Sequence, residues 1–303
     1  LSCNILFMNK TQIDQVFRCP CCNSENLKTI LKLDNDKKIN SFKEYSKKYY
    51  QNFLSNFSFE KVILAQCVLC LHLFYKYQPS EIFLNEMYSI HQKNKIKKTF
   101  SINAKKNIHI RKILSKILRV NKCYSILDYG SGAGELKEIA EGLNLSYYAY
   151  EPSKERNLID KKKKFFSNLN ELQNVNIKFD IIFINQVLEH TKDPLFVMKN
   201  IKVLCHSKTI IYVSVPNFNR TKEGGKFFSS WPYDVRFNHH TISPFQHLHC
   251  FNTLSLLKLM KNSGFKIKLN FKTVFNFNTL ILRVFLGLIL KKVSTTEIVF
   301  ELE

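Results

Sequence analysis

The sequence contains no apolar run of the roughly 20 residues that a membrane-spanning helix needs. A short apolar stretch at 1–8 is not preceded by the basic residues of a secretory signal peptide, and Met8 is a candidate start of translation. No internal repeat is apparent. We therefore expect a globular protein of the cytoplasm without a transmembrane segment.

Acidic residues are few, with 24 Asp and Glu against 46 Lys and Arg, and the formal net charge is +22. Such a charge is compatible with a polyanionic partner, either nucleic acid or an anionic membrane surface. Compositional drift is the alternative explanation, because Lys, Asn, Ile and Phe are all abundant. Arginine, the residue best suited to bidentate phosphate contacts, is scarce, and 161–164 is the only tight basic run. We favour drift.

The nine cysteines are too few for a disulfide scaffold in a chain of 303 residues. Four of them form two C-x-x-C pairs, namely Cys19, Cys22, Cys67 and Cys70. Four thiolates satisfy the tetrahedral preference of Zn²⁺ and leave no open position, so the predicted zinc site is structural. The alternatives are chance cysteines and an iron–sulfur or redox pair. Cys21 breaks the spacing and is not expected to bind, and His72 is expected to pack with Leu73 and Phe74.

From residue 124 onward, short apolar runs alternate with helical stretches, which is typical of a mostly parallel α/β sheet of the Rossmann type. The predicted strands are 125–129, 147–150, 165–166, 179–184, 209–215 and 265–269. Helices are predicted over much of 78–120 and over 253–263, where Thr253 can cap the helix, and the apolar stretch 280–290 is expected to be a docked helix. The predicted divisions are 1–16, a leader; 17–77, a small zinc-ribbon-like module; 78–119, a helical connector; 120–271, the α/β domain with an insertion at 218–246; and 272–303, a C-terminal extension.

The segment 128–134, Asp-Tyr-Gly-Ser-Gly-Ala-Gly, lies between a predicted strand and a predicted helix. Glycines at that junction let the backbone turn sharply and approach a ligand, and the helix N-terminus offers unpaired N–H groups. Glu151, at the end of the next strand, is placed to bind both hydroxyls of a ribose. A dinucleotide-binding fold is the competing interpretation, but its third glycine would stand at position 135, which is Glu.

This segment resembles the first motif, D-x-G-x-G-x-G, of the class I S-adenosylmethionine-dependent methyltransferases. The stretches 179–183, 187–190, 193–194 and 212–217 are similar to the fourth strand, its following turn and the fifth strand of that family. The resemblance covers roughly 105–270. It implies S-adenosylmethionine as cofactor and cofactor-binding roles for Asp128, Gly130, Gly132, Gly134, Glu151, Asn168 and Gln186. In this assignment Asn168 contacts adenine and Gln186 borders the sulfonium.

A cysteine-ribbon module ahead of such a domain resembles the sugar C-methyltransferases and related enzymes of bacterial surface-polysaccharide synthesis. That resemblance implies a histidine base, and His247 is the matching residue, with His240 as a substrate contact or alternate. The chain departs from the pattern at Gln246, where the family has an acid, and at Leu71, where glycine is usual. The family's long C-terminal domain is also mostly missing.

Three functions are therefore weighed. The first is methyl transfer to a small molecule, a sugar or nucleotide-linked sugar, with aromatic residues of 218–246 covering the acceptor. The second is an RNA methyltransferase that uses the zinc module and its basic surface to bind nucleic acid. The third is a non-catalytic binding module that has kept only the fold. We expect the first, with oligomeric state and methylated atom open.

Overall fold

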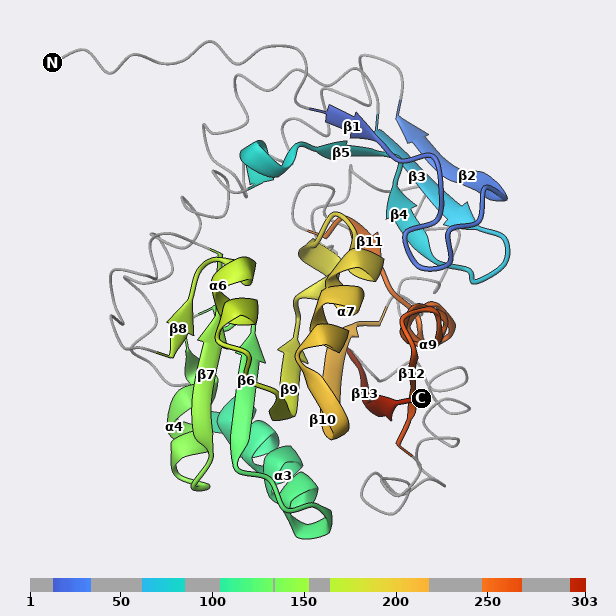
Figure 1. Cartoon of the computed structure of the whole chain (residues 1–303). Coiled ribbons are helices and arrows are strands. Elements are labelled where there is room, and N and C mark those ends of the chain that lie inside the picture. The colour runs from blue at the N-terminus through green and yellow to red at the C-terminus, as the bar shows by residue number, and fades with distance from the viewer. Residues whose placement is uncertain are drawn as a thin grey trace, which may run out of the picture.

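The computed structural model describes residues 13–33, 62–84, 104–132, 134–152, 164–217, 247–268 and 295–303. These residues form a seven-stranded sheet with helices on both faces and a smaller four-stranded sheet close to one end of its strands (Figure 1). None of the helices within these ranges is long and apolar enough to cross a membrane.

The large sheet has the strand order β12-β13-β10-β9-β6-β7-β8. Its parallel part consists of β6 (Ser125–Tyr129), β7 (Ser146–Tyr150), β8 (Phe165–Phe166), β9 (Phe179–Asn185) and β10 (Cys205–Pro216). Because these strands all run the same way, the loops that follow β6, β7 and β9 gather at one edge. The predicted Rossmann-like, mostly parallel fold is confirmed.

The strand β13 (Thr295–Leu302) belongs to this sheet, although it lies in the stretch 272–303, which was predicted to be a C-terminal extension. It is antiparallel to both β10 and β12 (Phe265–Ile267), so it is the reversed strand of an otherwise parallel sheet. The extension therefore ends inside the core of the α/β domain, where Ile298, Val299 and Phe300 are buried.

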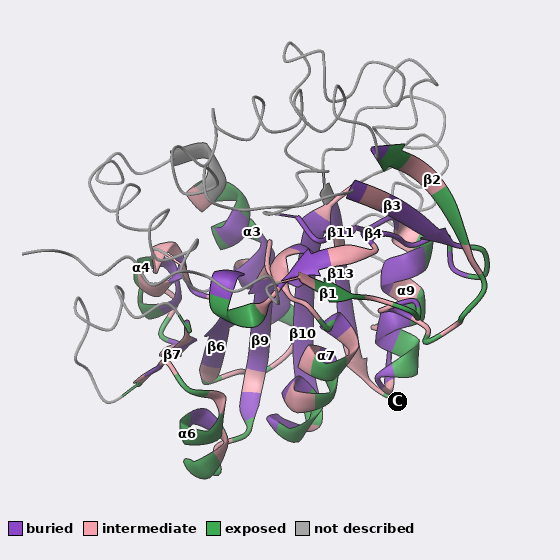
Figure 2. Cartoon of the chain, turned by 90° about the horizontal axis from the view of Figure 1, so that it is seen from above, coloured by how far each residue is buried: buried purple, intermediate pink, exposed green. Residues whose placement is uncertain are grey.

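Two apolar clusters cover the two faces of the large sheet, which Figure 2 shows as a buried central layer. Successive residues of a strand point to opposite faces, and both faces of β9 are apolar: Ile181 and Phe183 join one cluster, Ile182 and Ile184 the other. The helices α3 (Ala104–Val120) and α4 (Glu135–Glu141) contribute to the first cluster, and α6 (Leu169–Asn174), α7 (Pro194–Val203) and α9 (Thr253–Asn262) to the second.

The helix α9 begins at residue 253, as predicted, but its cap is Asn252 rather than Thr253. The Asn252 Oδ1 accepts from the Ser255 backbone N–H at 2.9 Å, and the Ser255 hydroxyl faces the Asn252 N–H at 3.0 Å. This reciprocal pair is a capping box.

The small sheet has the order β11-β4-β3-β2 and is formed by β2 (Leu27–Leu33), β3 (Val62–Cys67), β4 (Leu73–Tyr75) and β11 (His249–Cys250). A two-stranded ribbon of β1 (Ile13–Gln15) and β5 (Tyr77–Pro79) extends it. The connector was predicted to be helical from residue 78. Residues 78–79 instead belong to β5, because their backbone pairs with β1. Since β11 comes from the α/β part of the chain, the cysteine module and that domain share one sheet.

Several predicted features lie outside the described residues. They are the insertion 218–246 with His240, of which residue 217 is the last described neighbour, and the apolar stretch 280–290.

Candidate functional site

The loop between β6 and α4 contains three glycines with positive φ: Gly130 at 75°, Gly132 at 46° and Gly134 at 71°. Its first turn is held to the neighbouring strand, because the N–H groups of Gly130 and Ser131 both donate to the Tyr150 carbonyl, at 2.8 and 3.1 Å. The left-handed backbone conformation disfavours a Cβ at these positions. The predicted glycine turn is therefore present and stands at the edge where the parallel strands end.

Gly130 also has a steric reason to be glycine. A Cβ placed on it would lie 2.5 Å from Cγ2 of Val187 and 3.1 Å from Cγ1. The turn after β6 is thus packed against the turn after β9, and the absence of a side chain permits that approach. By contrast, a Cβ on Gly132 would meet only the Gly130 carbonyl oxygen, at 3.9 Å.

Two buried carboxylates flank the glycine turn. Asp128 is the last residue but one of β6, and its Oδ2 accepts a hydrogen bond from the Tyr147 hydroxyl at 2.9 Å. Glu151 follows β7, and its Oε2 accepts from the Gly132 N–H at 2.9 Å. A charged acceptor on that N–H orders the loop, and it places the carboxylate beside the turn.

Gln186 and Asn168, the other predicted cofactor contacts, lie at the same edge with different local roles. Gln186 has a φ of 58° directly after β9, and its Nε2 donates to the Ser214 hydroxyl at 3.1 Å. Its backbone N–H donates to the Ser214 carbonyl at 2.8 Å, so Ser214 of β10 binds both the backbone and the side chain of Gln186. The exposed Asn168 caps α6, its Oδ1 accepting from Asn170 N at 2.8 Å, and its contact with adenine stays a prediction.

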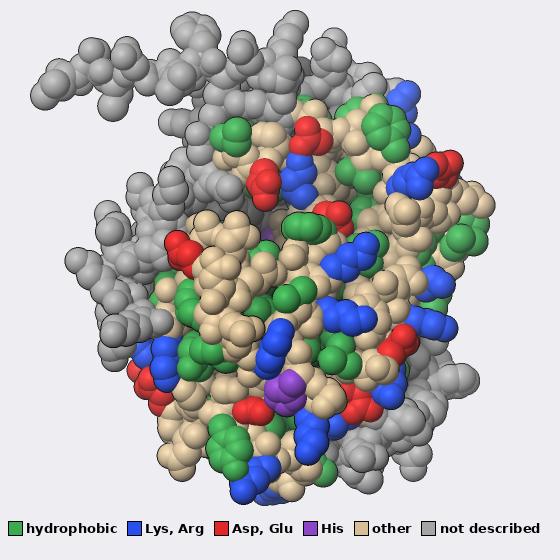
Figure 3. All heavy atoms as spheres, viewed as in Figure 1, with side chains coloured by type: hydrophobic (Ala, Val, Ile, Leu, Met, Phe, Trp, Pro, Cys, Tyr) green, Lys and Arg blue, Asp and Glu red, His purple; other side chains and the backbone are tan. Residues whose placement is uncertain are grey.

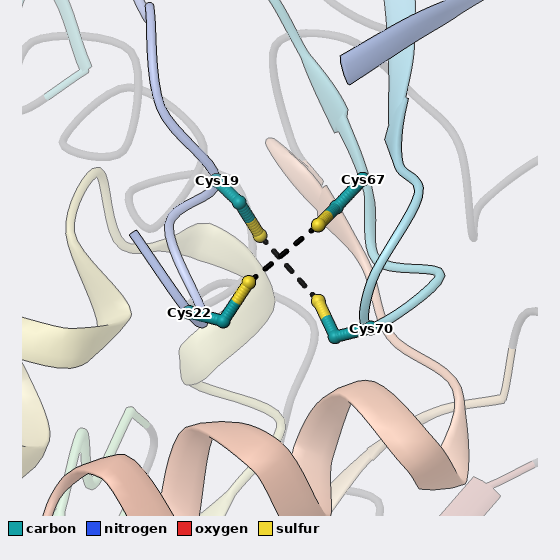
Figure 4. A group of neighbouring side chains, drawn as sticks. All are labelled: Cys19, Cys22, Cys67 and Cys70. Carbon is teal, nitrogen blue, oxygen red and sulfur yellow. Dashed lines mark hydrogen bonds between the residues drawn. The ribbon is translucent and has the colours of Figure 1, made fainter. Parts of the chain in front are cut away.

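The four paired cysteines come together although the pairs are far apart in sequence. Their Sγ atoms lie within 4.8 Å of one another, and Figure 4 shows them pointing at a common centre. The Sγ–Sγ distance is 3.5 Å for Cys19 with Cys70 and for Cys22 with Cys67. Burial raises the pKa of the Cys22 thiol to about 11. A cation at the centre would reverse that effect by binding the thiolates.

Both cysteine turns end on a residue with a left-handed backbone. Asn23, at φ 60°, donates its N–H to the Cys19 carbonyl, and Leu71, at φ 57°, donates to the Cys67 carbonyl. The departure from glycine at Leu71 therefore leaves the turn geometry intact at the cost of backbone strain. Cys21 is buried and lies outside the four-sulfur group.

His72 and His249 join the small sheet to the α/β domain. His249 Nε2 donates to the Thr191 carbonyl at 2.8 Å, and its Nδ1 faces His72 Nε2 at 3.2 Å. His72 lies outside both candidate metal groups and packs on Phe74 and Phe251, with ring centroids 5.9 and 4.7 Å away. The expected packing of His72 with Phe74 is confirmed.

A second cluster of candidate ligands forms where the turn after β9 meets the chain before β11. Glu189 and His190 lie in the short helix η2 (Leu188–His190), and His247 approaches from 57 residues further along the chain. One side-chain atom from each lies within 4.8 Å of the others, and the His190 and His247 rings meet edge to face at 4.7 Å. His247 was a predicted candidate and Glu189 and His190 fall in the stretch 187–190, but no local pattern in the sequence encodes the contact between them.

Burial dominates the electrostatics of this cluster. Glu189 is 1% exposed, and within the described structure neither of its carboxylate oxygens has a hydrogen-bond partner. Desolvation raises the pKa of the Glu189 carboxyl to about 8. The His190 Nε2 is 3.8 Å from Glu189 Oε1, which is too long for a hydrogen bond.

Comparison with known proteins identifies the domain. A family model described as "Methyltransferase domain" matches residues 92–269, more than half of the chain. No curated protein sequence matches this chain. Solved structures with similar folds include a SAM-dependent methyltransferase from Archaeoglobus fulgidus, at 13% identity and TM-score 0.42, covering 64% of this chain and 94% of the other. A second, from Clostridium acetobutylicum, has 13% identity and TM-score 0.43, covering 72% and 98%.

A third similar structure is the plantazolicin methyltransferase BamL, solved with a triazolic desmethylPZN analog and SAH. It has 15% identity and a TM-score of 0.48, and the match covers 87% of this chain and 98% of BamL.

Proposed function

Since the chain belongs to the methyltransferase-domain family and is an S-adenosylmethionine-dependent methyltransferase, we propose that it methylates a small molecule. The acceptor class we propose is a sugar or nucleotide-linked sugar of bacterial glycan biosynthesis. The observation that carries the proposal is the glycine turn, ordered by the hydrogen bond from Gly132 N–H to Glu151.

The cofactor supplies an electrophilic methyl group, and the residues at the sheet edge hold it for transfer. In our assignment Gly130, Gly132 and Gly134 present backbone to the methionine part, and Asp128 orients its amino group through the loop. Glu151 binds the ribose hydroxyls, and Gln186 borders the sulfonium. Alignment of this kind contributes on the order of 7–11 kcal/mol to lowering a transfer barrier.

A small-molecule acceptor is favoured over RNA by the distribution of charge. On the face drawn in Figure 3, lysine and arginine side chains are interspersed with aspartate and glutamate and do not form a continuous basic stripe. A nucleic-acid site would need such a stripe to neutralise phosphates. Binding of RNA with affinity that falls steeply with salt would favour the RNA alternative and overturn the sugar acceptor.

We propose that His247 promotes loss of a proton from the acceptor, with His240 as a further contact. His247 is 7% exposed and lies beside Glu189 and His190 at the edge where the cofactor loop stands. Its replacement should spare binding of S-adenosylhomocysteine and slow turnover. Normal turnover by His247→Ala would remove this residue from the mechanism.

We further propose that Cys19, Cys22, Cys67 and Cys70 bind a structural Zn²⁺. The four converging sulfurs support it, since they fill a tetrahedral shell. Cys67→Ser should release zinc and lower the melting temperature, whereas the matched control Cys123→Ser, a free thiol outside the group, should retain one zinc per chain. The proposal would be contradicted if the purified wild-type protein contained no zinc and its melting temperature were not lowered.

The methyltransferase assignment itself is tested by calorimetry. Wild-type protein should bind S-adenosylhomocysteine, and Asp128→Ala should abolish binding without unfolding the chain. The acceptor is then sought by incubating the protein with nucleotide-linked sugars and labelled S-adenosylmethionine. If label appears in an RNA pool and in none of the sugars, the result would support the RNA methyltransferase instead.

A further inference from the structure

We propose that Glu189, His190 and His247 form a second metal site, which binds a divalent transition-metal ion and positions a hydroxyl group of the acceptor. This inference rests on the proposed methyl transfer and deepens it, because it names the kind of atom that is methylated. The site is separate from the four cysteines in ligand type and in function.

The geometry of the cluster suits a metal ion. One ligand atom from each residue falls within 4.8 Å of the others, and the His190 Nε2 to Glu189 Oε1 distance is 3.8 Å. Ligands at about 2.0–2.2 Å from a tetrahedral metal are separated from each other by roughly 3.3–3.6 Å. The His190–Glu189 pair therefore needs to close by only a few tenths of an ångström, and the other two pairs by at most roughly 1–1.5 Å.

The buried carboxylate supplies an independent argument. Both oxygens of Glu189 are buried without a hydrogen-bond partner in the described structure, which is a costly state for a group that is ionised in water. A buried carboxyl group is normally hydrogen-bonded, paired with a cation or bound to a metal. A dication between Glu189 and the two imidazoles would compensate the charge and use both kinds of ligand.

The surrounding fold holds the two ligand segments together. His249, two residues after His247, donates to the carbonyl of Thr191, the residue after His190, at 2.8 Å. The strand β11 begins two residues after His247 and pairs with β4. The chain that follows His247 is therefore held in place by this pairing. Preorganised ligands of this kind bind a metal without large rearrangement.

The number of protein ligands indicates a catalytic site. Two histidines and one glutamate leave at least one position open for another ligand, as in catalytic zinc centres. The site also adjoins the cofactor loop, because Val187, two residues before Glu189, is in close contact with Gly130. A hydroxyl bound at the open position would thus stand next to the methyl donor.

The chemistry that follows is methylation of oxygen. A divalent metal lowers the pKa of a bound hydroxyl, so the proton leaves to solvent at neutral pH. The oxygen then forms a bond to the methyl carbon while the carbon–sulfur bond breaks, and its electron pair stays on sulfur to give S-adenosylhomocysteine. His247 acts in this scheme as a ligand that promotes proton loss through the metal, not as the base itself.

Manganese binding distinguishes this site from the cysteines, because Mn²⁺ prefers oxygen and nitrogen ligands to thiolates. Mn²⁺ is titrated into the full-length protein and followed by calorimetry and by the EPR signal of free Mn²⁺. Wild type should bind one ion, and Glu189→Gln and His247→Gln should each weaken binding by at least tenfold. Glu141→Gln, an exposed carboxylate at the far end of α4, is the matched control and should bind as wild type does.

S-adenosylhomocysteine binding, measured on the same samples, separates the two proposals. If the wild type does not bind S-adenosylhomocysteine, the proposed function is overturned, and Mn²⁺ binding stands as a separate result. Absence of Mn²⁺ binding by wild type, or equal binding by both cluster variants, would overturn the metal site. Circular dichroism of each variant identifies misfolding, and if Glu189→Gln misfolds, His247→Gln decides.

Discussion

Replacing Gly130 with alanine tests whether the cofactor loop is held by its packing against Val187. The new Cβ would stand 2.5 Å from Cγ2 of Val187, and the residue would keep a φ of 75°. The left-handed conformation costs about 1–2 kcal/mol for an L-residue, and overpacking a close contact costs about 1–3 kcal/mol. The free energy of unfolding should therefore fall by about 2–5 kcal/mol.

Gly132→Ala is the matched control, because it has the backbone strain without the clash. Its Cβ would meet only the Gly130 carbonyl oxygen at 3.9 Å, so it should cost only the conformational part, about 1–2 kcal/mol. Urea unfolding with linear extrapolation gives both values. The difference between the two variants measures the steric contact.

A double variant isolates the contact itself. Val187→Ala removes both γ-methyl groups, which are the two atoms nearest to the Cβ that Gly130→Ala adds. In the double variant the steric cost should be relieved, which gives a favourable coupling of about 1–3 kcal/mol. A coupling near zero, or equal costs for Gly130→Ala and Gly132→Ala, would refute the view that the two turns are locked together.

Three further substitutions probe other parts of the site and fold. Glu151→Ala removes the charged acceptor on Gly132 N–H and should weaken S-adenosylhomocysteine binding about 10–100-fold by calorimetry, whereas unchanged affinity would exclude Glu151. Asn252→Ala removes the α9 cap and should lower the free energy of unfolding by about 1–2 kcal/mol in urea. Although burial opposes it, hydrogen bonds from Tyr124 N–H and Ser125 lower the pKa of Asp180, so its stabilisation is present above its ordinary pKa and lost as the pH falls. The stability difference between wild type and Asp180→Asn should therefore stay constant above about pH 5 and shrink as the pH falls below about 4, and a difference that is the same at all pH values would contradict this.

The features that the sequence predicted well are those encoded by neighbouring residues. The helix α3 lies within the predicted helical stretch 78–120, and it buries residues at helical spacing, namely Ile110, Ile113, Leu114 and Ile117. The glycine turn at 128–134 follows from the conformations that its residues permit. The parallel strands were recognisable because each is an apolar run bounded by turns.

The features that the sequence did not predict depend on contacts between distant segments. The strand β13 has its partners β10 and β12 elsewhere in the chain, so its place in the sheet is decided by tertiary pairing. Thr253 was the predicted cap of α9, but the reciprocal hydrogen bonds with Ser255 are made by Asn252. The grouping of Glu189 with His247 likewise requires the whole fold.

The cysteine module is connected to the His247 segment of the candidate site by strand pairing and hydrogen bonds. Its strand β4 pairs with β11, which begins two residues after His247, and His72 on the module contacts His249 at 3.2 Å. Asn252 Nδ2 donates to the Leu71 carbonyl at 2.8 Å, and Asn262 Nδ2 donates to the Cys21 carbonyl at 3.0 Å, so α9 is bonded to both cysteine turns. Loss of order at the thiolates would therefore be transmitted to the His247 segment through bonds that leave the glycine turn untouched. If the four cysteines bind the zinc ion that we propose, that ion would fix the small sheet, which includes the strand that follows His247.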